Sequence, residues 1–486
     1  MKSTQLLVLI MLWGAVTTAS SDTLENVLDG FDKADNSSDA LEVLENFDEQ
    51  EVPAESLEVL DGFDGQPTNL MTEDTVTEKS NMTSIQISGW SKLVGIWNIA
   101  HHATEKERTD WRGLSRLRAE LLIEMRAKLP YSWQFFASGK AFHDVAYTLN
   151  GRDQYSNEVL DNYETELELR ELYVSKALNS HIDLKLGRQI LVWGRSSNLR
   201  VTDILNPLDM RELGLTDIED LRLPVTMLRL DSYYDVWQFT AVVIPEKRFE
   251  KLPIFGHDFY AGQARPPADI KPNNTLSNME YAAALTGTFS GWDFSLYWAH
   301  VYDDKAYVQL QKDEDDTPQL IHNRLKMLGG AGNFVLGNTL LFAEIAHLSG
   351  VQFSYLPSEG FSRTDVLIGL EYSGLTNTTL SIEAANQHLH HFNAQAHQAI
   401  AKKDSFQWVF RFNRKFLREQ LSFTWFALFD GLKGQGGGVQ RYQLDYDIAS
   451  ALSVSGGVVL YHGGTHQSFQ DIANNDRLFF EIKYSF

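Results

Sequence analysis

The sequence predicts an all-β protein: a closed antiparallel transmembrane β-barrel of about 18 strands, with 16 as the alternative count. Three observations predict it. Apolar and polar residues alternate over about ten residues at a time. The segments between these stretches alternate between long and short, and charged side chains occupy the face opposite the apolar one. A partly helical long loop and a disordered N-terminal tail complete the predicted architecture.

Residues 1–21 have the layout of a secretory signal peptide. Lys2 precedes an apolar run from Leu6 to Trp13, and small residues follow, so cleavage is expected after Ala19 or Ser21. A membrane anchor is the alternative, but the run is far shorter than the ~20 residues that a spanning helix needs. The chain is therefore expected to be exported.

Residues 22–80 form an acidic tail with its own composition. Between residues 22 and 79 it carries 18 acidic residues against Lys33 and Lys79, in a chain whose net charge is -23. Such charge blocks are usually disordered, and an acidic protein is not expected to bind nucleic acid. Cysteine is absent, which excludes disulfides and thiolate metal sites.

A short pattern recurs three times in the tail, in steps of sixteen residues: Val-Leu, an acidic residue, Gly or Asn, then Phe-Asp. On a helix, Leu24 and the first copy's Val27, Leu28 and Phe31 fall at i, i+3, i+4 and i+7 and form one apolar stripe, and such a stripe is too short to be stable alone. We interpret the copies as tethered peptides that dock on a periplasmic partner, and an acidic spacer that arose by duplication is the alternative. The predicted docking residues are Val27, Leu28, Phe31, Val43, Leu44, Phe47, Val59, Leu60 and Phe63.

The body, residues 81–486, reads as strands of one length. Ten residues tilted by about 40° rise about 25 Å, the height of the apolar band of an outer-membrane barrel, whereas strands of a soluble sandwich are nearer five or six residues. The predicted strands are 84–97, 114–129, 131–145, 164–177, 180–192, 225–232, 235–244, 280–289, 291–301, 324–336, 338–348, 364–374, 377–387, 405–414, 419–429, 438–448, 451–461 and 477–486.

The connections predict the orientation of the barrel. Tight turns and long loops alternate, as in bacterial barrels, whose tight turns lie in the periplasm. An even strand count then puts both chain ends on the periplasmic side, where the tail has to be for docking. The last strand, which ends on Phe486, is expected to engage the barrel-assembly machinery, and the apolar face is expected to contact outer-membrane lipid. Seven tryptophans near strand ends, among them Trp193 and Trp298, suggest interfacial girdles.

Charges of both signs on the inward face predict a hydrated lumen rather than a packed core. They alternate with leucines and isoleucines along the strands. The predicted pore-lining residues are Arg116, Arg118, Glu120, Glu124, Arg126, Glu164, Glu166, Glu168, Arg170, Asp183, Lys185 and Arg188.

The loop at 193–224 has helix signals that an ordinary external loop does not need. Asn206 and Pro207 predict the start of a helical turn that Gly214 ends, and Thr216 with Glu219 predicts a capping box for a second turn. Two interpretations remain open: a loop folded into the barrel mouth, or a structured external loop. The predicted constriction residues are Arg195, Asn198, Arg200, Asp203, Asn206, Asp209, Arg211, Asp217, Glu219, Asp220 and Arg222.

The run Gly187–Asn198, with the blocks Asn206–Asp209 and Glu219–Pro224, resembles the domain of unknown function 1302 family of Gram-negative outer-membrane proteins. The resemblance covers most of the chain after the tail. It implies a porin-like barrel without a settled substrate, so no binding residues are carried over. Members are often encoded near exporters of the resistance-nodulation-division type, which implies an inner-membrane partner that passes hydrophobic compounds or lipids outward.

The sequence offers no catalytic constellation and no cofactor site. Histidines at 101–102 and at 388, 390 and 391 lie in or beside long loops, where solvated side chains are the simpler interpretation than a metal site. No Ser/His/acid set has a spacing that singles it out. A channel for small or hydrophobic solutes, coupled through its tail to a transport partner, is the leading hypothesis. A plugged anchor for a periplasmic complex and an embedded hydrolase are the alternatives.

Overall fold

The computed structural model describes residues 84–486, except 103–108, 217, 263, 311–316, 355, 357–359 and 394–401. The expected signal peptide, the acidic tail and its nine docking residues therefore lie outside the described residues. No helix in the described part is long and apolar enough to cross a membrane.

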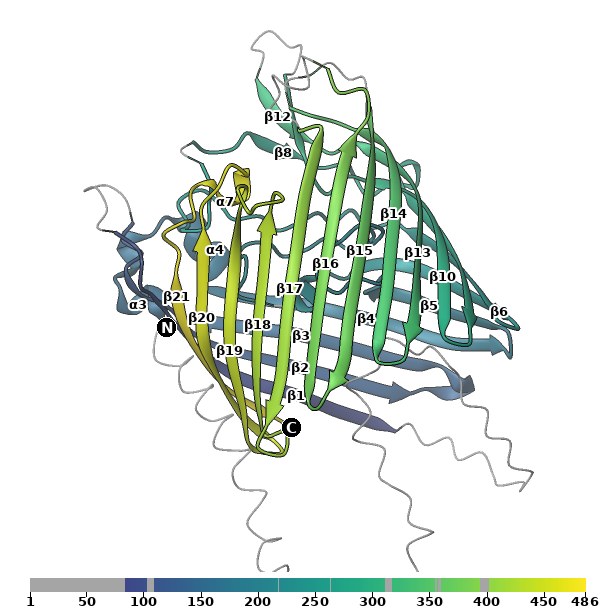
Figure 1. Ribbon diagram of the computed structural model, residues 1–486, viewed down its shortest axis with the longest axis horizontal. Helices are drawn as coiled ribbons and strands as arrows, with labels where there is room; N and C mark the ends of the chain where they lie inside the picture. The colour runs from purple at the N-terminus through teal and green to yellow at the C-terminus, as the bar shows by residue number, and fades with distance from the viewer. Residues whose placement is uncertain are drawn as a thin grey trace, which may run out of the picture. The chain divides into compact units, whose positions relative to one another are not determined.

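Eighteen strands form one closed antiparallel sheet, and the predicted barrel is confirmed with the higher of the two strand counts (Figure 1). Each barrel strand pairs with the barrel strand that follows it in the chain, and the last strand, β21, pairs with β1, which closes the ring. The strands are β1 (Ile85–Asn98), β2 (Gly113–Lys128), β3 (Gln134–Asp144), β4 (Thr165–Asn179), β5 (Ile182–Gln189), β6 (Val225–Tyr234), β7 (Trp237–Ile244), β9 (Glu280–Phe289), β10 (Trp292–Tyr302), β13 (Arg324–Leu336), β14 (Thr339–Val351), β15 (Phe361–Leu375), β16 (Thr378–Leu389), β17 (Asp404–Phe416), β18 (Leu421–Asp430), β19 (Gly437–Ala449), β20 (Leu452–His462) and β21 (Arg477–Ser485).

Tight turns gather at one end of the barrel and long connections at the other (Figure 1). The beginning of β1 lies at the tight-turn end, because Ile85 pairs with Ala127 next to the β2–β3 turn. The end of β21 lies there too, since Tyr484 pairs with Leu452 next to the β19–β20 turn. Both ends of the sheet are therefore on the tight-turn side, as the alternation of connection lengths predicts.

The two faces of each strand have opposite character, as β14 illustrates. Phe342, Glu344 and Ala346 are buried inside the ring, whereas Leu341 and Ile345 between them are 37% and 51% exposed on its outside. The period-two alternation therefore gives the closed sheet an inner and an outer face of different composition. The outer face is apolar and the inner face is mixed.

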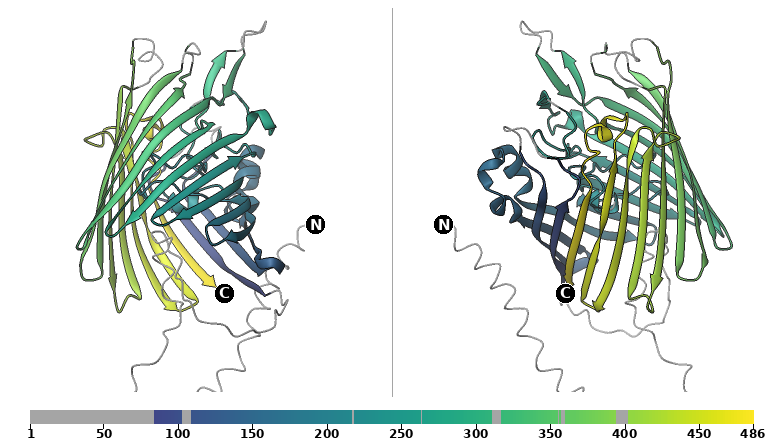
Figure 2. Two further views of the ribbon diagram at one scale, coloured as in Figure 1. Left: turned by 90° about the vertical axis from the view of Figure 1, so that its right-hand side faces the viewer. Right: turned by 60° about the vertical axis from the view of Figure 1, so that its left-hand side comes forward.

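Short elements occupy the long connections (Figure 2), and η1 lies in the tight turn between β2 and β3. The predicted helical turn that begins at Pro207 is wrong: Leu208 and Asp209 form isolated bridges with Arg222 and Lys251 instead. A second turn is present as α5. The elements are η1 (Pro130–Ser132), α3 (Ala146–Leu149), η2 (Arg152–Gln154), α4 (Asn157–Tyr163), α5 (Ile218–Leu221), η3 (Leu276–Asn278), α7 (Gln467–Gln470) and a small sheet of β8 (Ala268–Ile270), β11 (Tyr307–Leu310) and β12 (Pro318–Ile321).

The largest apolar core lies inside the ring. Leu191, Trp193 and Val201 from the β5–β6 loop pack against inward residues of β6–β17, including Met227 and Met327, which are both fully buried. Trp193 stacks on Tyr297, with ring centroids 4.8 Å apart. The suggestion that Trp193 belongs to an interfacial girdle is therefore wrong, whereas Trp298 is 42% exposed on the outer face. The loop is folded against the inner wall.

Candidate functional site

Two long connections contribute to the interior of the barrel. We call residues 190–224, between β5 and β6, the first crossing loop, and residues 245–262, after β7, the second crossing loop. Side chains of both loops bond to inward residues of strands that are far from their own anchoring strands. The candidate functional site is the lumen that these loops occupy.

A carboxylate on β14 holds the start of the first crossing loop. Glu344, which is 3% exposed, accepts hydrogen bonds from the backbone N–H groups of Arg195 at 2.6 Å, Ser196 at 2.9 Å and Thr202 at 3.1 Å. The hydroxyl of Thr202 donates a further bond of 2.7 Å. Successive N–H groups that converge on an anion form a backbone nest. The loop is therefore wrapped around a buried wall carboxylate.

Gly194 permits this approach. Its φ of +88° is in the left-handed region, which favours glycine, and a Cβ atom there would lie 2.6 Å from Glu344 Oε1. The position is restricted both by its backbone conformation and by the carboxylate beside it. Its N–H donates to the hydroxyl of Tyr297 on β10, at 3.2 Å.

Two further wall carboxylates bond the same end of the loop. Glu383 on β16, 2% exposed, accepts from Ser196 Oγ at 2.5 Å and from Asn198 Nδ2 at 2.7 Å. Asp293 on β10 forms an ion pair with the guanidinium of Arg195. The residues from Gly194 to Asn198 are therefore bonded to three different strands of one side of the barrel.

The far end of the first crossing loop is bonded to the other side of the ring. Glu212 forms ion pairs with Arg116 and Arg118 of β2, and the Arg118 contact measures 3.3 Å. The hydroxyl of Tyr461 on β20 donates to the Leu213 carbonyl at 2.7 Å. β2 and β14 are nine steps apart around the 18-strand ring in either direction. The loop thus spans the lumen from one wall to the opposite one.

Bonds within the loop fix its two ends together. Asn206 accepts from the Leu191 N–H at 2.8 Å and donates to the Leu223 carbonyl at 2.9 Å. Arg222 pairs with Asp203 at 2.9 Å, and both side chains are 4% exposed. A buried ion pair of this kind requires excellent geometry to offset its desolvation. The first crossing loop is therefore stabilised by hydrogen bonds and an ion pair of its own.

The second crossing loop pairs its cations with the acidic row of β4. Lys251 lies 2.5 Å from Glu166 and 3.2 Å from Glu168, and Arg248 forms an ion pair with Glu168. Further along, Asp258 pairs with Arg477 of β21 at 3.2 Å. The sequence interpretation treats 245–279 only as a long external loop, and the structure corrects this for residues 245–262.

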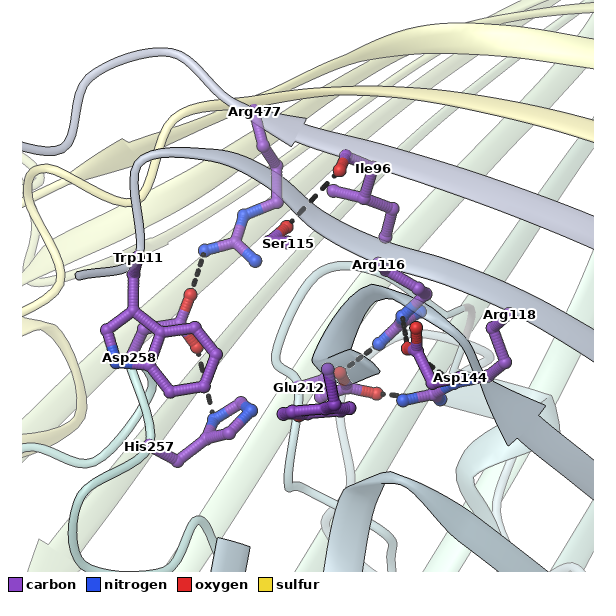
Figure 3. A pocket seen from close by; sticks show the side chains of 11 residues that line it. Ile96, Trp111, Ser115, Arg116, Arg118, Asp144, Glu212, His257, Asp258 and Arg477 are labelled. Atoms are coloured by element: carbon purple, nitrogen blue, oxygen red, sulfur yellow. Dashed lines mark hydrogen bonds and ion pairs between the residues drawn. The ribbon is translucent and has the colours of Figure 1, made fainter. Parts of the chain in front are cut away.

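A small polar cavity forms where β1, β2 and β21 face the two crossing loops (Figure 3). Arg116, Arg118 and Glu212 lie on one side of it, and Asp258 with Arg477 on the other, as the dashed ion pairs in Figure 3 show. The lining residues are Ile96, Trp111, Ser115, Arg116, Arg118, Asp144, Tyr147, Glu212, His257, Asp258 and Arg477.

Ionisation in this cavity follows from burial and from the arginines. Burial opposes the charge of Glu212, but Arg116 and Arg118 hold the pKa of its carboxyl far below the usual range. Burial also opposes the charge of Asp258, but Arg477 together with His257 and His101 lowers the pKa of its carboxyl below the usual value. Burial lowers the pKa of His257 to about 4, against the raising effect of Asp258. At neutral pH the loop carboxylates are therefore charged and the His257 ring is neutral.

The predicted wall residues occupy several settings. Arg116, Arg118 and Glu120 are buried, and Glu120 pairs with Lys140 of β3 at 3.0 Å. Glu166, Glu168 and Arg170 contact the crossing loops, the last through the Arg222 carbonyl at 3.2 Å. Glu124 and Arg126 pair with each other at 3.4 Å near the tight-turn end. Asp183 and Lys185 lie beside Asp231 and Arg229 in the register of β5 and β6.

Two of the predicted wall residues lie elsewhere. Leu186 is 48% exposed on the outside of the barrel. Arg188 lies two residues further along the same strand, and the β5–β6 register is continuous between the two residues, so Arg188 is on the same outer face. Alternation therefore places Arg188 on the face opposite Asp183 and Lys185, where it pairs with Glu246. Glu164 precedes β4 and pairs with Arg152 at 2.9 Å, outside the strand wall.

The predicted constriction residues also separate into groups. Arg195 and Asn198 bond the wall, as described above. Arg200, Asp203, Asn206 and Arg222 hold the loop together, with Arg200 donating to the Asp203 and Asn206 carbonyls at 2.7 Å each. Arg211 pairs with Asp209 at 2.6 Å and with Glu166 at 2.8 Å. Asp220 is exposed. Asp217 and the side chain of Glu219 lie outside what the structure describes.

Sequence reasoning missed the acidic anchors Glu344, Glu383 and Glu212. A signal for the first two is present, since each is the one charged residue among the inward positions of its strand. Such a residue needs a partner from elsewhere in the fold. Within the described ranges, no group of three or more His, Cys, Asp or Glu side chains is arranged to hold a metal ion.

Comparisons with known proteins give one family match and several structural similarities. The family model described as "Protein of unknown function (DUF1302)" matches residues 75–486. The chain is similar to the Pseudomonas aeruginosa outer membrane protein OpdK, with 10% identity, 83% of this chain and 99% of that chain covered, and a TM-score of 0.48. It is also similar to the Acinetobacter baumannii outer membrane channel DcaP, with 12% identity, 83% and 97% covered, and a TM-score of 0.41. No curated protein gives a significant match.

Proposed function

This chain belongs to the DUF1302 family, and from that premise we propose that it is a passive channel of the Gram-negative outer membrane whose lumen is narrowed by its two crossing loops. An 18-stranded closed sheet leaves room for an aqueous opening. Its apolar outer face suits lipid, and its mixed-charge inner face suits water. The proposed role is transport rather than catalysis.

One observation carries this proposal: the first crossing loop is bonded to Glu344 on one wall and to Arg116 and Arg118 on the opposite wall. A loop that only covered the barrel from outside would not need buried partners on opposite strands. A loop that crosses the lumen sets its free width and its charge. We therefore assign the solute filter to this loop and to the wall residues that it contacts.

The direction of the barrel follows from its ends. We propose that the tight turns face the periplasm, where β1 then begins, and that the tail belongs to the same compartment. We propose that the three tail repeats dock on a periplasmic or inner-membrane transport component, which would hand small or hydrophobic solutes to the channel. Repetition would raise the local concentration of docking peptides.

Ion conductance in planar lipid bilayers tests the channel. The purified full-length protein is expected to produce discrete conductance steps. A variant that lacks residues 22–66 is expected to keep these steps while solute export in cells is lost. If the pure barrel gives no steps, the channel proposal is wrong. If the deletion leaves cellular export intact, the proposed role of the tail is wrong.

A plugged anchor for a periplasmic complex is the second candidate. Ion pairs inside the lumen favour it, because Arg211–Glu166 and Lys251–Glu166 join the two crossing loops to β4, while the buried Arg222–Asp203 pair holds the first crossing loop together. Such an anchor would be electrically silent in bilayers, yet deletion of the tail would still disrupt the complex in cells. The conductance experiment therefore separates the two candidates.

A further inference from the structure

Three histidines lie together near the long-loop end of β14–β16, and two of them contact the hydroxyl of Thr364. His347 Nδ1 lies 3.0 Å from Thr364 Oγ1, and His390 Nε2 lies 2.8 Å from the same atom. The rings of His347 and His390 are 5.6 Å apart between centroids, and those of His388 and His390 are 5.1 Å apart. We call His347, Thr364, His388 and His390 the rim cluster.

The rim cluster is on the outside of the barrel. Along β14, Ile345 precedes His347 by two residues and is 51% exposed, whereas Glu344 on the alternate face is 3% exposed in the lumen. On β15, Val366 follows Thr364 by two residues and is 42% exposed, whereas Asp365 is buried. Strand alternation therefore places the cluster on the lipid-facing surface, where the apolar outer face ends.

Further cationic groups extend the rim cluster across neighbouring strands. His300 of β10 pairs in register with Lys326 of β13, and Lys326 pairs with Ser349, two residues from His347. Arg324 lies 4.2 Å from the centre of the Tyr302 ring on the same outer face. His391 and Lys403 are the other basic groups nearby. The one acidic partner seen in the described residues is Asp404, 2.7 Å from His388.

This composition favours an anion over a metal ion. Thr364 engages one nitrogen each of His347 and His390, and the described residues contain no metal-ligating group of three. When the imidazoles are protonated they repel one another, and Asp404 balances only one of them. An anion with several acceptor oxygens would relieve this repulsion and accept bonds from imidazolium, ammonium and hydroxyl donors together.

We propose that the rim cluster, with His300 and Lys326, binds the phosphate groups of a lipid headgroup in the leaflet at the long-loop end. The inference rests on the membrane location in the proposed function. It requires no conduction through the lumen. Basic side chains at the boundary of an apolar band attract anionic headgroups by charge, and the apolar residues below the cluster would contact the acyl chains of the same lipid.

Binding of lipid A to the full-length protein in detergent tests this site, with native mass spectrometry as the readout. Bisphosphorylated lipid A is compared with monophosphorylated lipid A, at pH 5.5 and at pH 8. The triple variant His347→Ala/His388→Ala/His390→Ala is expected to bind the bisphosphorylated lipid about tenfold more weakly, or about 1.4 kcal/mol. Wild-type binding is expected to strengthen at the lower pH, because the imidazoles gain charge.

The matched control is Lys415→Ala/Arg418→Ala, which removes two cations at the tight-turn end and is expected to bind lipid A as the wild type does. Equal binding by the triple variant would overturn the proposal, as would indifference to the number of phosphates. Loss of binding on chelation and recovery with Zn²⁺ would mean a metal site instead. Conductance of the same preparation distinguishes failure of the lipid site from failure of the channel.

Discussion

At the scale of single residues, the first crossing loop is held at its two ends by two carboxylates with different partners. Glu344 is satisfied by backbone N–H groups, and Glu212 by two guanidinium groups. A buried acceptor that loses its donors costs about 1–3 kcal/mol. Small changes at these positions should therefore be visible in stability and in transport.

Gly194→Ala is expected to destabilise the protein by about 1–3 kcal/mol more than Gly291→Ala. Both glycines have a positive φ, so both substitutions incur the left-handed penalty. Only the alanine at 194 would also push against Glu344, since nothing lies within 4 Å of a Cβ at Gly291. The measurement is the free energy of unfolding in denaturant. Equal losses in the two variants would show that Glu344 does not restrict this position.

Arg116→Glu with Arg118→Glu is expected to make the channel more selective for cations and to repel Glu212 from the wall. Reversal potentials across a salt gradient measure the selectivity. Arg418→Glu is the control, because Arg418 is exposed in the tight turn between β17 and β18, and this charge change should leave the reversal potential unchanged. Unaltered selectivity in the double variant would remove these arginines from the pore wall.

Stability is expected to fall as the pH drops from 6.5 to 4. The pKa of His257 is about 4 in the folded protein and about 6.5 when exposed, so the unfolded chain binds the proton first and acid favours unfolding. A shift of this size corresponds to about 3 kcal/mol over that window. His257→Phe keeps a ring against Tyr163, stacked 3.7 Å away, and should flatten the decline. His181→Ala, at an exposed turn, should not.

At the scale of elements, strands and turns could be predicted from the sequence, because their signals are local. All 18 predicted strands are present, and the alternation of loop lengths places the ends of the sheet correctly. Arg188 was predicted to face the lumen with Asp183 and Lys185, but it lies on the outer face of β5, because it is an odd number of residues away from both. This error could have been avoided from the sequence, because residues an odd number of positions apart in a strand lie on opposite faces.

The loop elements could be predicted only in part. Asn206 followed by Pro207 has the form of a helix start, yet the Asn206 amide bonds backbone groups of residues 191 and 223. Tertiary hydrogen bonds to flanking segments outweigh the local capping preference. The partners of the loop, such as Glu344 and Glu383, lie about 150 to 190 residues away in sequence, and no local pattern indicates which strands they meet.

Asn206→Ala is expected to destabilise the first crossing loop by about 1–3 kcal/mol, because it removes the side-chain hydrogen bonds that join the two ends of the loop. Limited proteolysis of the folded protein should then cut within residues 190–224 faster than in the wild type. Asn278→Ala is the control, because that side chain bonds in an exposed turn between β8 and β9. Equal cleavage rates in the two variants would mean that Asn206 does not hold the loop.

At the scale of the whole molecule, the barrel has three parts: an apolar outer face, an inner face with both charged and apolar residues, and loops that cross the lumen. The closed ring was predictable because alternation and strand length are repeated 18 times. The bridging of β14 and β2 by one loop was left open between two interpretations, since it depends on contacts across the ring. The structure therefore adds the feature on which the proposed function depends.

Single-channel conductance of Glu344→Ala/Glu383→Ala in planar bilayers tests this account most directly. Without these two carboxylates the loop loses its bonds to β14 and β16, so the open steps should be larger than those of the wild type. Glu371→Ala, an inward carboxylate of β15 without a bond to either crossing loop among the described residues, should leave the steps at the wild-type size. If the double variant conducts as the wild type does, the first crossing loop does not narrow the lumen.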